Sequence, residues 1–323
     1  AGRRRSVVVC TGMVMQPFDL VVIGAGSSGA SLALEAVRRG LRVALLEAGD
    51  PGIGTSSRST KLLHGGVRYL ELAFKKADPA QFKLVREALA ERRYWIEQAP
   101  FLAHELRIAL PTRHGLEQLY YRVGLGMYDL LAGAAGLEPT QGLGGAELRE
   151  LLPGLGGSVS SGLLYSDGQF DDARLNLLLV LTAQAAGATV QRDCRVVGFE
   201  QVNGRLQAAI SQGPDGQQQR WLAHQFVNAT GIAADGLRQQ AQPDAPSRLL
   251  VSRGIHLVLS EQLCPGGVGL LIPRTRDGRV LFVLPFLGRT LVGTTDQACP
   301  LEEATQVTPE ETDYLIEHLQ QWF

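Results

Sequence analysis

Residues 18–47 constrain the fold of this chain more than any other segment. A β-branched apolar run at 20–23 precedes Gly24-Ala-Gly-Ser-Ser-Gly29, which has the pattern G-x-G-x-x-G. Apolar residues at helical spacing follow at 30–39, Gly40 ends that helix, and 42–46 form a second apolar run. This order predicts a β-α-β unit with its glycines at the positions where such units bind a dinucleotide.

Each glycine of the pattern has its own expected role. Gly24 allows the tight turn, Gly26 lets the backbone approach a pyrophosphate, and Gly29 lets the helix pack close to the strand. The helix N-terminus around Ser28 offers free N–H groups and the positive end of the helix dipole to the phosphates. Glu47 ends the second strand, where its carboxylate would accept hydrogen bonds from a ribose. A ribose bound in this way favours FAD or NAD over NADP.

A second segment, far along the chain, indicates the same class of ligand. An apolar strand at 226–228 ends in Ala229-Thr230-Gly231, where the backbone near the glycine would pass the dinucleotide. An ordinary NAD domain does not need this second signal, so the pair favours FAD. Val196, in the alternating polar and apolar stretch that begins at Arg195, is assigned to the same site.

Charge and cysteine content argue against several functional classes. The formal net charge is −1, so no overall field favours nucleic acid or an anionic membrane. The four cysteines are scattered without a C-x-x-C pattern, so we expect no metal site or redox pair, and a reducing compartment fits. No apolar run reaches the roughly 18 residues that a membrane span needs. Residues 1–16 are expected to be a disordered extension rather than a signal peptide, because no small-residue cleavage site precedes residue 18.

The stretch after the second strand concentrates polar side chains beside the nucleotide motif. Residues 49–60 are rich in Gly, Ser and Thr, a composition typical of a loop that binds an anion or a flavin edge, or of a solvated connector. Lys61, His64, Arg68 and Tyr69 follow at once among glycines and apolar residues. Several polar groups crowded beside a nucleotide loop favour a site over a connector.

The same stretch resembles a long motif of the FAD-dependent, quinone-linked glycerol-3-phosphate dehydrogenases, T-S-S-x-S-x-K-L-x-H-G-G-x-R-Y-L. It is present here as Thr55, Ser56, Ser57, Ser59, Lys61, Leu62, His64, Gly65, Gly66, Arg68, Tyr69 and Leu70. Thr60 replaces the serine usual in the family and keeps the hydroxyl. Further likenesses are E-A-L-A-E-R at 87–92, Y-x-D-x-x-x-D-D-A-R-L at 165–175, R-G-I-H at 253–256 and G-T-T-D at 293–296.

The resemblance implies an FAD enzyme that oxidises sn-glycerol 3-phosphate to dihydroxyacetone phosphate and passes the electrons to a quinone. It places His256 at a substrate hydrogen bond or as general base, with a core histidine as the alternative. Arg68 would bind the phosphate or an oxygen of the substrate, or else pair with an acid such as Glu71, while Tyr69 and Lys61 would position it. The cofactor residues that it implies are Thr55, Ser56, Ser57, Ser59, His64, Gly65 and Gly66. A cytoplasmic location, with possible peripheral contact to the inner face of a membrane, comes from the family alone.

We predict an α/β fold in which a Rossmann-like FAD-binding domain, of the glutathione-reductase/D-amino-acid-oxidase type, is interleaved with a mainly antiparallel β substrate domain. The FAD-binding domain is expected at 17–85 and 155–250, and the substrate domain at 86–154 and 251–310. Residues 311–323 would begin a further C-terminal part. Residues 116–131 predict a helix packed in the core rather than a membrane face, and Asp171 and Asp172 are expected only to cap a helix.

Three other functions share the fold. One is a flavin oxidase acting on an amine or amino acid, which H-G-G-x-R-Y argues against. Another passes its electrons to oxygen. The third is a non-catalytic flavin-binding fragment, because the family's later phosphate-binding arginine and G-G-K-x-T-T segment are not among these 323 residues. We therefore expect very weak or no turnover from these residues alone.

Overall fold

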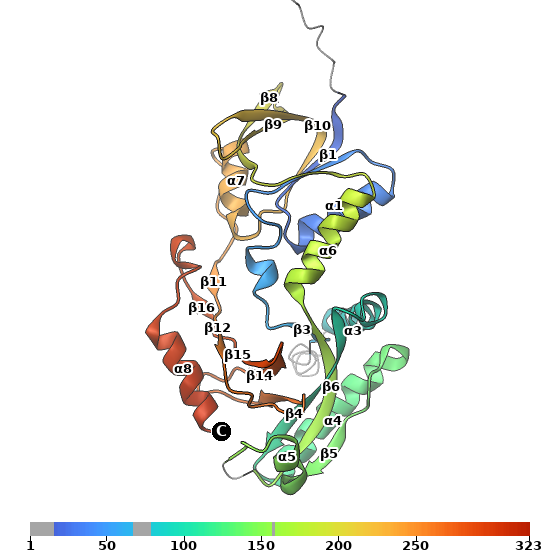
Figure 1. Cartoon of the computed structure of the whole chain (residues 1–323), viewed down its shortest axis with the longest axis vertical. Helices are drawn as coiled ribbons and strands as arrows, with labels where there is room; N and C mark the ends of the chain where they lie inside the picture. The colour runs from blue at the N-terminus through green and yellow to red at the C-terminus, as the bar shows by residue number, and fades with distance from the viewer. Residues whose placement is uncertain (1–15, 67–78, 157–158) are drawn as a thin grey trace, which may run out of the picture. The chain divides into compact units, whose positions relative to one another are not determined.

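The computed structural model of this chain describes residues 16–66, 79–156 and 159–323. The chain divides into two compact units (Figure 1). One unit contains the chain up to Ser56 together with Asn176–Leu249, and the other contains Ser57–Leu175 and Leu250–Phe323. The units therefore change at 56/57, 175/176 and 249/250, whereas the sequence predicts boundaries at 85/86, 154/155 and 250/251. The assignment of FAD binding to one part of the chain and of substrate binding to the other remains a prediction.

The first unit is built on a six-stranded sheet with the order β7-β2-β1-β10-β9-β8. Strand β1 pairs in parallel with both β2 and β10, and β8, β9 and β10 form an antiparallel meander. The predicted β-α-β unit is therefore present, because α1 connects the parallel neighbours β1 and β2. The elements are β1 (Phe18–Ile23), α1 (Ser27–Arg38), β2 (Val43–Leu46), η1 (Thr55–Ser57), α6 (Asp172–Ala185), β7 (Thr189–Gln191), β8 (Arg195–Val202), β9 (Arg205–Gln212), β10 (Gln218–Asn228), η3 (Gly231–Ala233) and α7 (Ala234–Ala241), with η1 and α6 each extending across a unit boundary.

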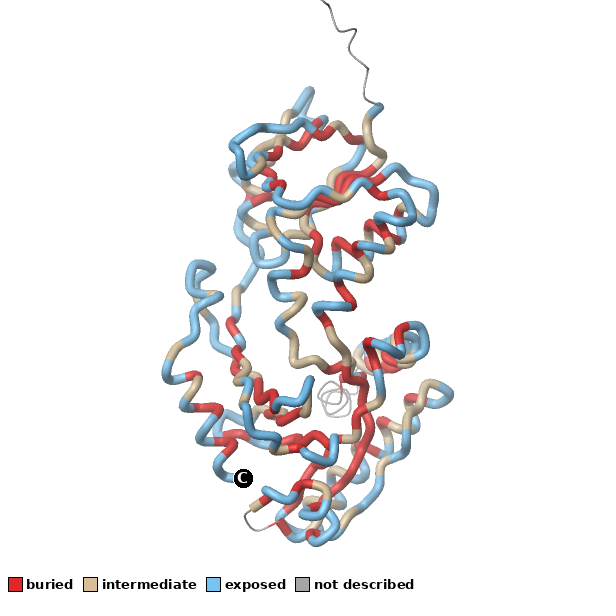
Figure 2. Tube along the Cα trace, viewed as in Figure 1, coloured by how far each residue is buried: buried red, intermediate tan, exposed pale blue. Residues whose placement is uncertain are grey.

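The core of this unit lies on both faces of β1 and β2, which Figure 2 shows as almost continuously buried. On one face, Val22 and Leu45 pack with Ala33 of α1 and Val180 of α6. Figure 1 shows these two helices side by side. Strands buried on both faces explain why 20–23 and 43–46 are continuous apolar runs rather than alternating ones.

The second unit contains a larger, mainly antiparallel sheet with the order β12-β15-β14-β13-β4-β6-β3, and β5 also pairs with β6. A separate two-stranded sheet joins β11 to β16. The elements are β3 (Leu62–Leu63), α3 (Pro79–Gln98), β4 (Ala103–Thr112), α4 (Gly115–Ala132), η2 (Gly133–Ala135), β5 (Gln141–Gly144), α5 (Gly145–Leu151), β6 (Ser161–Phe170), β11 (Ser252–Arg253), β12 (His256–Leu259), β13 (Gly269–Ile272), β14 (Leu281–Phe286), β15 (Arg289–Gly293), β16 (Gln297–Ala298), η4 (Leu301–Glu303) and α8 (Pro309–Gln320). The predicted α/β class is confirmed.

Helix α4 only partly fulfils its predicted core packing. Leu125 and Tyr128 are buried, whereas Leu116 and Leu130 are 79% and 81% exposed. The core-packing expectation is therefore wrong for the outward side, because apolar residues lie on more of the helix circumference than the sheet covers. Within the described residues, no helix combines the length and apolar character required to cross a bilayer.

Candidate functional site

The first unit forms the predicted nucleotide loop between β1 and α1. Gly24 has a φ of 101°, and a Cβ on it would lie 2.5 Å from the carbonyl oxygen of Ala229. A Cβ on Gly29 would lie 1.9 Å from the carbonyl oxygen of Gly24. Ala229 in turn donates its N–H to Ile23, at 2.8 Å. The loop, the helix start and the end of β10 are thus so close that side chains at Gly24 and Gly29 would collide with backbone.

The N-terminus of α1 can accept an anion. Its N-cap is Gly26, and its first turn contains no acidic residue. The Ser27 N–H donates to Ser56 Oγ at 2.8 Å, whereas Ser28 and Gly29 occupy first-turn positions whose N–H groups lack an intrahelical acceptor. These free donors and the helix dipole favour a phosphate.

Glu47 lies beside this loop at the end of β2. Its Oε2 accepts the N–H of Ala25 at 2.7 Å and its Oε1 that of Gly49 at 3.0 Å. Each carboxylate oxygen can accept a further hydrogen bond. A pocket of about 260 Å³ opens next to it, lined by Ala48, Asp193, Arg195, Gln212, Gly213 and Pro214. Glu47 and Val196 each adjoin one of these lining residues, and Val196 itself is buried on β8.

Asn176 of α6 is a member of this loop region that sequence reasoning missed. Its buried Nδ2 donates to the carbonyl oxygen of Ala25 at 2.9 Å. Its Oδ1 is also buried, and no hydrogen-bond partner for it is found among the described residues. Thr230 hydrogen-bonds Asn228, and Gly231, with a φ of 59°, begins η3. The glycine cradle, the free helix N–H groups and Glu47 together fit a dinucleotide.

The second unit brings Lys61 and Asp172 together. Lys61 Nζ lies 2.5 Å from Asp172 Oδ1, and the exposed fractions of the two side chains are 13% and 2%. Lys61 also donates to the carbonyl oxygen of Ser57 at 2.7 Å. Ser59 donates to Asp172 Oδ2 through both its N–H and its hydroxyl, at 3.0 and 2.7 Å.

The capping expectation is confirmed for Asp171 and wrong for Asp172. Asp171 Oδ1 accepts the N–H of Arg174 at 3.0 Å, which is the bond of an N-cap. Asp172 is already inside the first turn of α6, and its carboxylate turns to Lys61 and Ser59 instead. A buried carboxylate needs such partners because desolvation disfavours its charge.

His256 lies at the start of β12 and faces the same segment. Its Nε2 is 3.0 Å from Thr60 Oγ1. Burial lowers the pKa of His256 to about 4, helped by the charge of Lys61 and opposed by that of Asp172. The imidazole is therefore neutral at neutral pH. A Cβ on Gly293 would lie 2.1 Å from the imidazole Cδ2, so the ring packs directly on that glycine.

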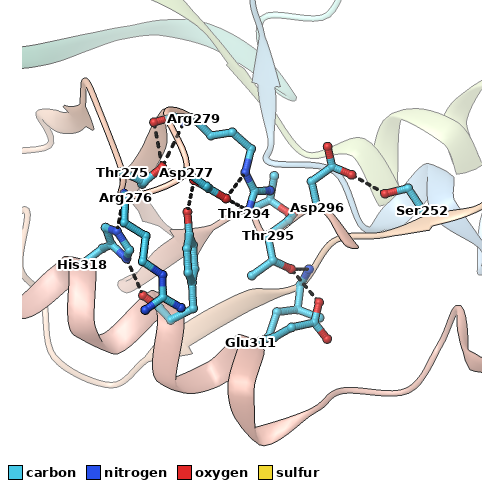
Figure 3. A network of polar contacts seen from close by, with 12 residues as sticks. Ser252, Thr275, Arg276, Asp277, Arg279, Thr294, Thr295, Asp296, Glu311 and His318 are labelled. Atoms are coloured by element: carbon cyan, nitrogen blue, oxygen red, sulfur yellow. Dashed lines mark hydrogen bonds and ion pairs between the residues drawn. The ribbon is translucent and has the colours of Figure 1, made fainter. Parts of the chain in front are cut away.

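Hydrogen bonds connect the R-G-I-H segment, which ends in His256, to the G-T-T-D segment and to α8. The N–H of Ile255 donates to Thr295 Oγ1 at 2.9 Å, and the same hydroxyl donates to Glu311 Oε1 at 2.8 Å. Arg253 Nε donates to the other oxygen of Glu311 at 2.8 Å. Figure 3 shows Thr295 and Glu311 within this network, and Asp296 accepting a hydrogen bond from Ser252.

The remaining predicted site residues flank Lys61 in the sequence. Thr55 begins η1. His64 Nδ1 accepts the N–H of Gly66 at 3.1 Å, and the Gly65 N–H donates to Tyr128 Oη at 2.7 Å. Arg68 and Tyr69 lie outside the described residues. Within the described residues no group of three or more His, Cys, Asp or Glu side chains could hold a metal ion.

Comparison with known proteins identifies relatives over nearly the whole chain. The family described as FAD dependent oxidoreductase matches residues 19–323. The mitochondrial glycerol-3-phosphate dehydrogenase of Arabidopsis thaliana is 41% identical over 309 residues, which are 93% of this chain and 49% of that protein. The human mitochondrial enzyme of the same name is 40% identical over 304 residues, which are 92% of this chain and 42% of that protein. The chain thus spans about half the length of these relatives, or less.

Solved structures agree with these sequence matches. The glycerol-3-phosphate dehydrogenase of Bacillus halodurans, complexed with FAD, superposes with a TM-score of 0.76 at 28% identity over 96% of this chain and 54% of that chain. Glycine oxidase from Bacillus cereus has a TM-score of 0.64 at 18% identity over 95% of this chain and 78% of that chain, which shows a shared fold only.

Proposed function

The chain belongs to the family of FAD-dependent oxidoreductases, and from this premise we propose that its protein oxidises sn-glycerol 3-phosphate to dihydroxyacetone phosphate. The cofactor prediction, FAD rather than NAD, agrees with this family. The observation that supports the substrate most strongly is the grouping of Lys61, Asp172, Thr60 and His256 in the second unit. Relatives at 40% and 41% identity have the proposed activity in their names.

His256 would accept the proton from the C2 hydroxyl of the substrate. Its low pKa keeps the ring unprotonated and able to accept a hydrogen bond at neutral pH. Thr60 Oγ1 lies within hydrogen-bonding distance of His256 Nε2 and would fix the orientation of the imidazole ring. The substrate would then either displace Thr60 from Nε2 or form its own hydrogen bond beside it. FAD, when bound, would accept the hydride from C2.

Lys61 would supply a fixed positive charge for the substrate. An ammonium group has three N–H donors, and the bonds to Asp172 and to the Ser57 carbonyl use two of them. The third could donate to an oxygen of the substrate. Asp172 would act as a positioning residue, because its two oxygens hold Lys61 and Ser59 in place at the same time.

Arg68 and Tyr69 remain the proposed substrate-side residues of the H-G-G-x-R-Y motif. A guanidinium supplies the planar pair of donors that a phosphate oxygen pair accepts. For FAD, we propose the backbone around Gly26 and Ser28 at the pyrophosphate, Glu47 at the adenosine ribose, and Ala229-Thr230-Gly231 and Val196 along the rest of the dinucleotide. Quinone as the electron acceptor and a peripheral contact with a membrane are further parts of this proposal.

An anaerobic reduction experiment tests the proposal. The purified protein should be yellow, and even slow bleaching of its flavin absorbance by glycerol 3-phosphate, with none by glycine or sarcosine, would support the proposal. Bleaching by the amino acids alone would indicate an amine oxidase of the same fold. A flavin that none of these substrates bleaches would contradict the proposed activity for this chain. The yield of hydrogen peroxide per turnover in air separates oxygen from quinone as the acceptor.

A further inference from the structure

A buried polar cluster lies directly behind the H-G-G segment, on the side of helices α3 and α4. It consists of Tyr128 on α4, Asp167 on β6 and Arg92 on α3, which are between 1% and 3% exposed. The Gly65 N–H donates to Tyr128 Oη at 2.7 Å. Arg92 Nη1 donates to Asp167 Oδ1 at 2.9 Å. The cluster thus connects one backbone amide of the segment to three separate elements of the second unit.

The hydrogen bonds in this cluster have one consistent direction. Because the Tyr128 hydroxyl accepts from Gly65, its own hydrogen must go to another acceptor. The two oxygens of Asp167 lie 3.2 and 3.3 Å away and can accept it. Arg92 balances the charge of Asp167 and also lies over the Tyr128 ring, with 5.6 Å between the guanidinium carbon and the ring centroid. The ion pair therefore fixes the position of the hydroxyl on which Gly65 depends.

Packing also restricts the position of Gly65. A Cβ on Gly65 would lie 2.5 Å from Tyr128 Oη and 2.4 Å from Leu89 Cδ2. Leu89 is fully buried on α3. The backbone at Gly65 is thus pressed against both helices, and only glycine allows this approach. Burial and the charge of Asp167 raise the pKa of Tyr128 well above its usual value, so the hydroxyl stays protonated and able to donate.

We infer that Tyr128 is a positioning residue for the segment His64-Gly65-Gly66, which it holds through the Gly65 N–H, with Arg92 and Asp167 fixing its hydroxyl. The inference rests on the proposed function, because that proposal assigns the segment to the site. The sequence places a helix around Tyr128 but gives no sign that its hydroxyl meets a glycine 63 residues earlier.

The test is Tyr128→Phe, which removes only the hydroxyl, with Tyr94→Phe as the matched control. Tyr94 is on α3 and is 48% exposed, so its hydroxyl is not expected to fix the position of a buried segment. We expect the rate of flavin reduction by glycerol 3-phosphate to fall between about tenfold and a hundredfold in Tyr128→Phe, the scale of a small misplacement of reacting groups. The peptide containing Gly65 should exchange its amide hydrogens at least tenfold faster, with β4 and β6 unchanged. The control should match the wild type in both measurements.

The hydrogen-exchange measurement does not require an active enzyme, so it judges the inference even if the proposed function fails. Unchanged exchange at Gly65 in Tyr128→Phe would overturn it. If the wild type is active, an unchanged rate of flavin reduction in Tyr128→Phe would also overturn the inference. If Tyr128→Phe does not fold, Asp167→Asn serves in its place, because it removes the ion pair with Arg92 that fixes the position of the Tyr128 hydroxyl. We expect that variant to show faster exchange at Gly65 than the wild type, and equal exchange there would also overturn the inference.

Discussion

The Nε2 atom of His256 lies 3.0 Å from Thr60 Oγ1, although 196 residues separate the two in the sequence. The contact joins the R-G-I-H strand to the loop that contains Lys61, so two motifs found independently in the sequence meet in one place. Partial burial of the imidazole lowers its pKa to about 4, and the nearby charge of Lys61 adds to this shift.

This low pKa predicts how stability depends on pH. The folded His256 stays neutral down to about pH 4, whereas in the unfolded chain it binds a proton below about pH 6.5. The unfolded state therefore binds more protons in this window, and the free energy of unfolding should fall as pH falls from 6.5 to 4. The loss should approach about 3 kcal/mol, at about 1.4 kcal/mol for each unit of pKa difference.

Urea unfolding of the wild type and His256→Gln over this pH range measures the effect. The glutamine cannot titrate, so the variant should show a flatter dependence on pH. His224→Gln, at an exposed position, should keep the wild-type slope. Equal slopes for wild type and His256→Gln would mean that the folded imidazole is protonated as easily as the unfolded one.

The Lys61–Asp172 pair predicts a large loss of stability on removing one partner. Lys61→Met would leave the Asp172 carboxylate, whose side chain is 2% exposed, without its counter-charge. The expected loss is about 3 kcal/mol in the free energy of unfolding at pH 7. Lys61 has a φ of 61°, a conformation that any residue with a Cβ adopts less readily than glycine. Methionine has a Cβ and a length similar to those of lysine, so the substitution adds no new backbone strain.

The exposed pair Lys83–Glu87 provides the control for this prediction. Its atoms are 3.7 Å apart and its side chains are 78% and 62% exposed. Lys83→Met should therefore cost at most about 0.5 kcal/mol. Adding Asp172→Asn to Lys61→Met should recover part of the loss, because a neutral amide needs no counter-charge. A loss for Lys61→Met as small as that for Lys83→Met would show that solvent already screens Asp172.

The Lys61–Asp172 pair also illustrates which features of the fold and the site can be predicted from the sequence and which cannot. The β-α-β unit, its glycines and Glu47 are predictable because the pattern and the structure it dictates are local to residues 18–47. The rule for helix starts is equally local, and it predicts a capping role for Asp172 that the structure contradicts. Its partner Lys61 is 111 residues away, and Asn176 meets Ala25 over 151 residues. Such contacts depend on how the sheets assemble, which single-sequence periodicity does not encode.

A third prediction concerns the close approach at the nucleotide loop. In Gly29→Ala the added Cβ would be 1.9 Å from the carbonyl oxygen of Gly24, and a backbone atom cannot rotate away. The variant should lose bound flavin and unfold at a lower temperature. Gly49→Ala is the matched control, because Gly49 has nothing within 4 Å of its added Cβ and no positive φ. Flavin content by absorbance and thermal unfolding measure both effects, and a fully flavinated Gly29→Ala would place the cofactor elsewhere.

The last prediction separates two roles of Glu47. Its carboxylate accepts the N–H groups of Ala25 and Gly49, and we propose that it also binds the adenosine ribose. Leaving ribose hydroxyls unpaired costs on the order of 1–3 kcal/mol, so Glu47→Ala should weaken FAD binding by roughly tenfold to a hundredfold. FMN lacks the adenosine, so its weaker binding should be nearly the same in wild type and variant if the ribose contact dominates. An equal loss of affinity for FAD and FMN would instead show that Glu47 acts by shaping the loop. Glu47→Gln, which keeps one oxygen acceptor, should lie between wild type and Glu47→Ala in an FAD titration followed by flavin fluorescence.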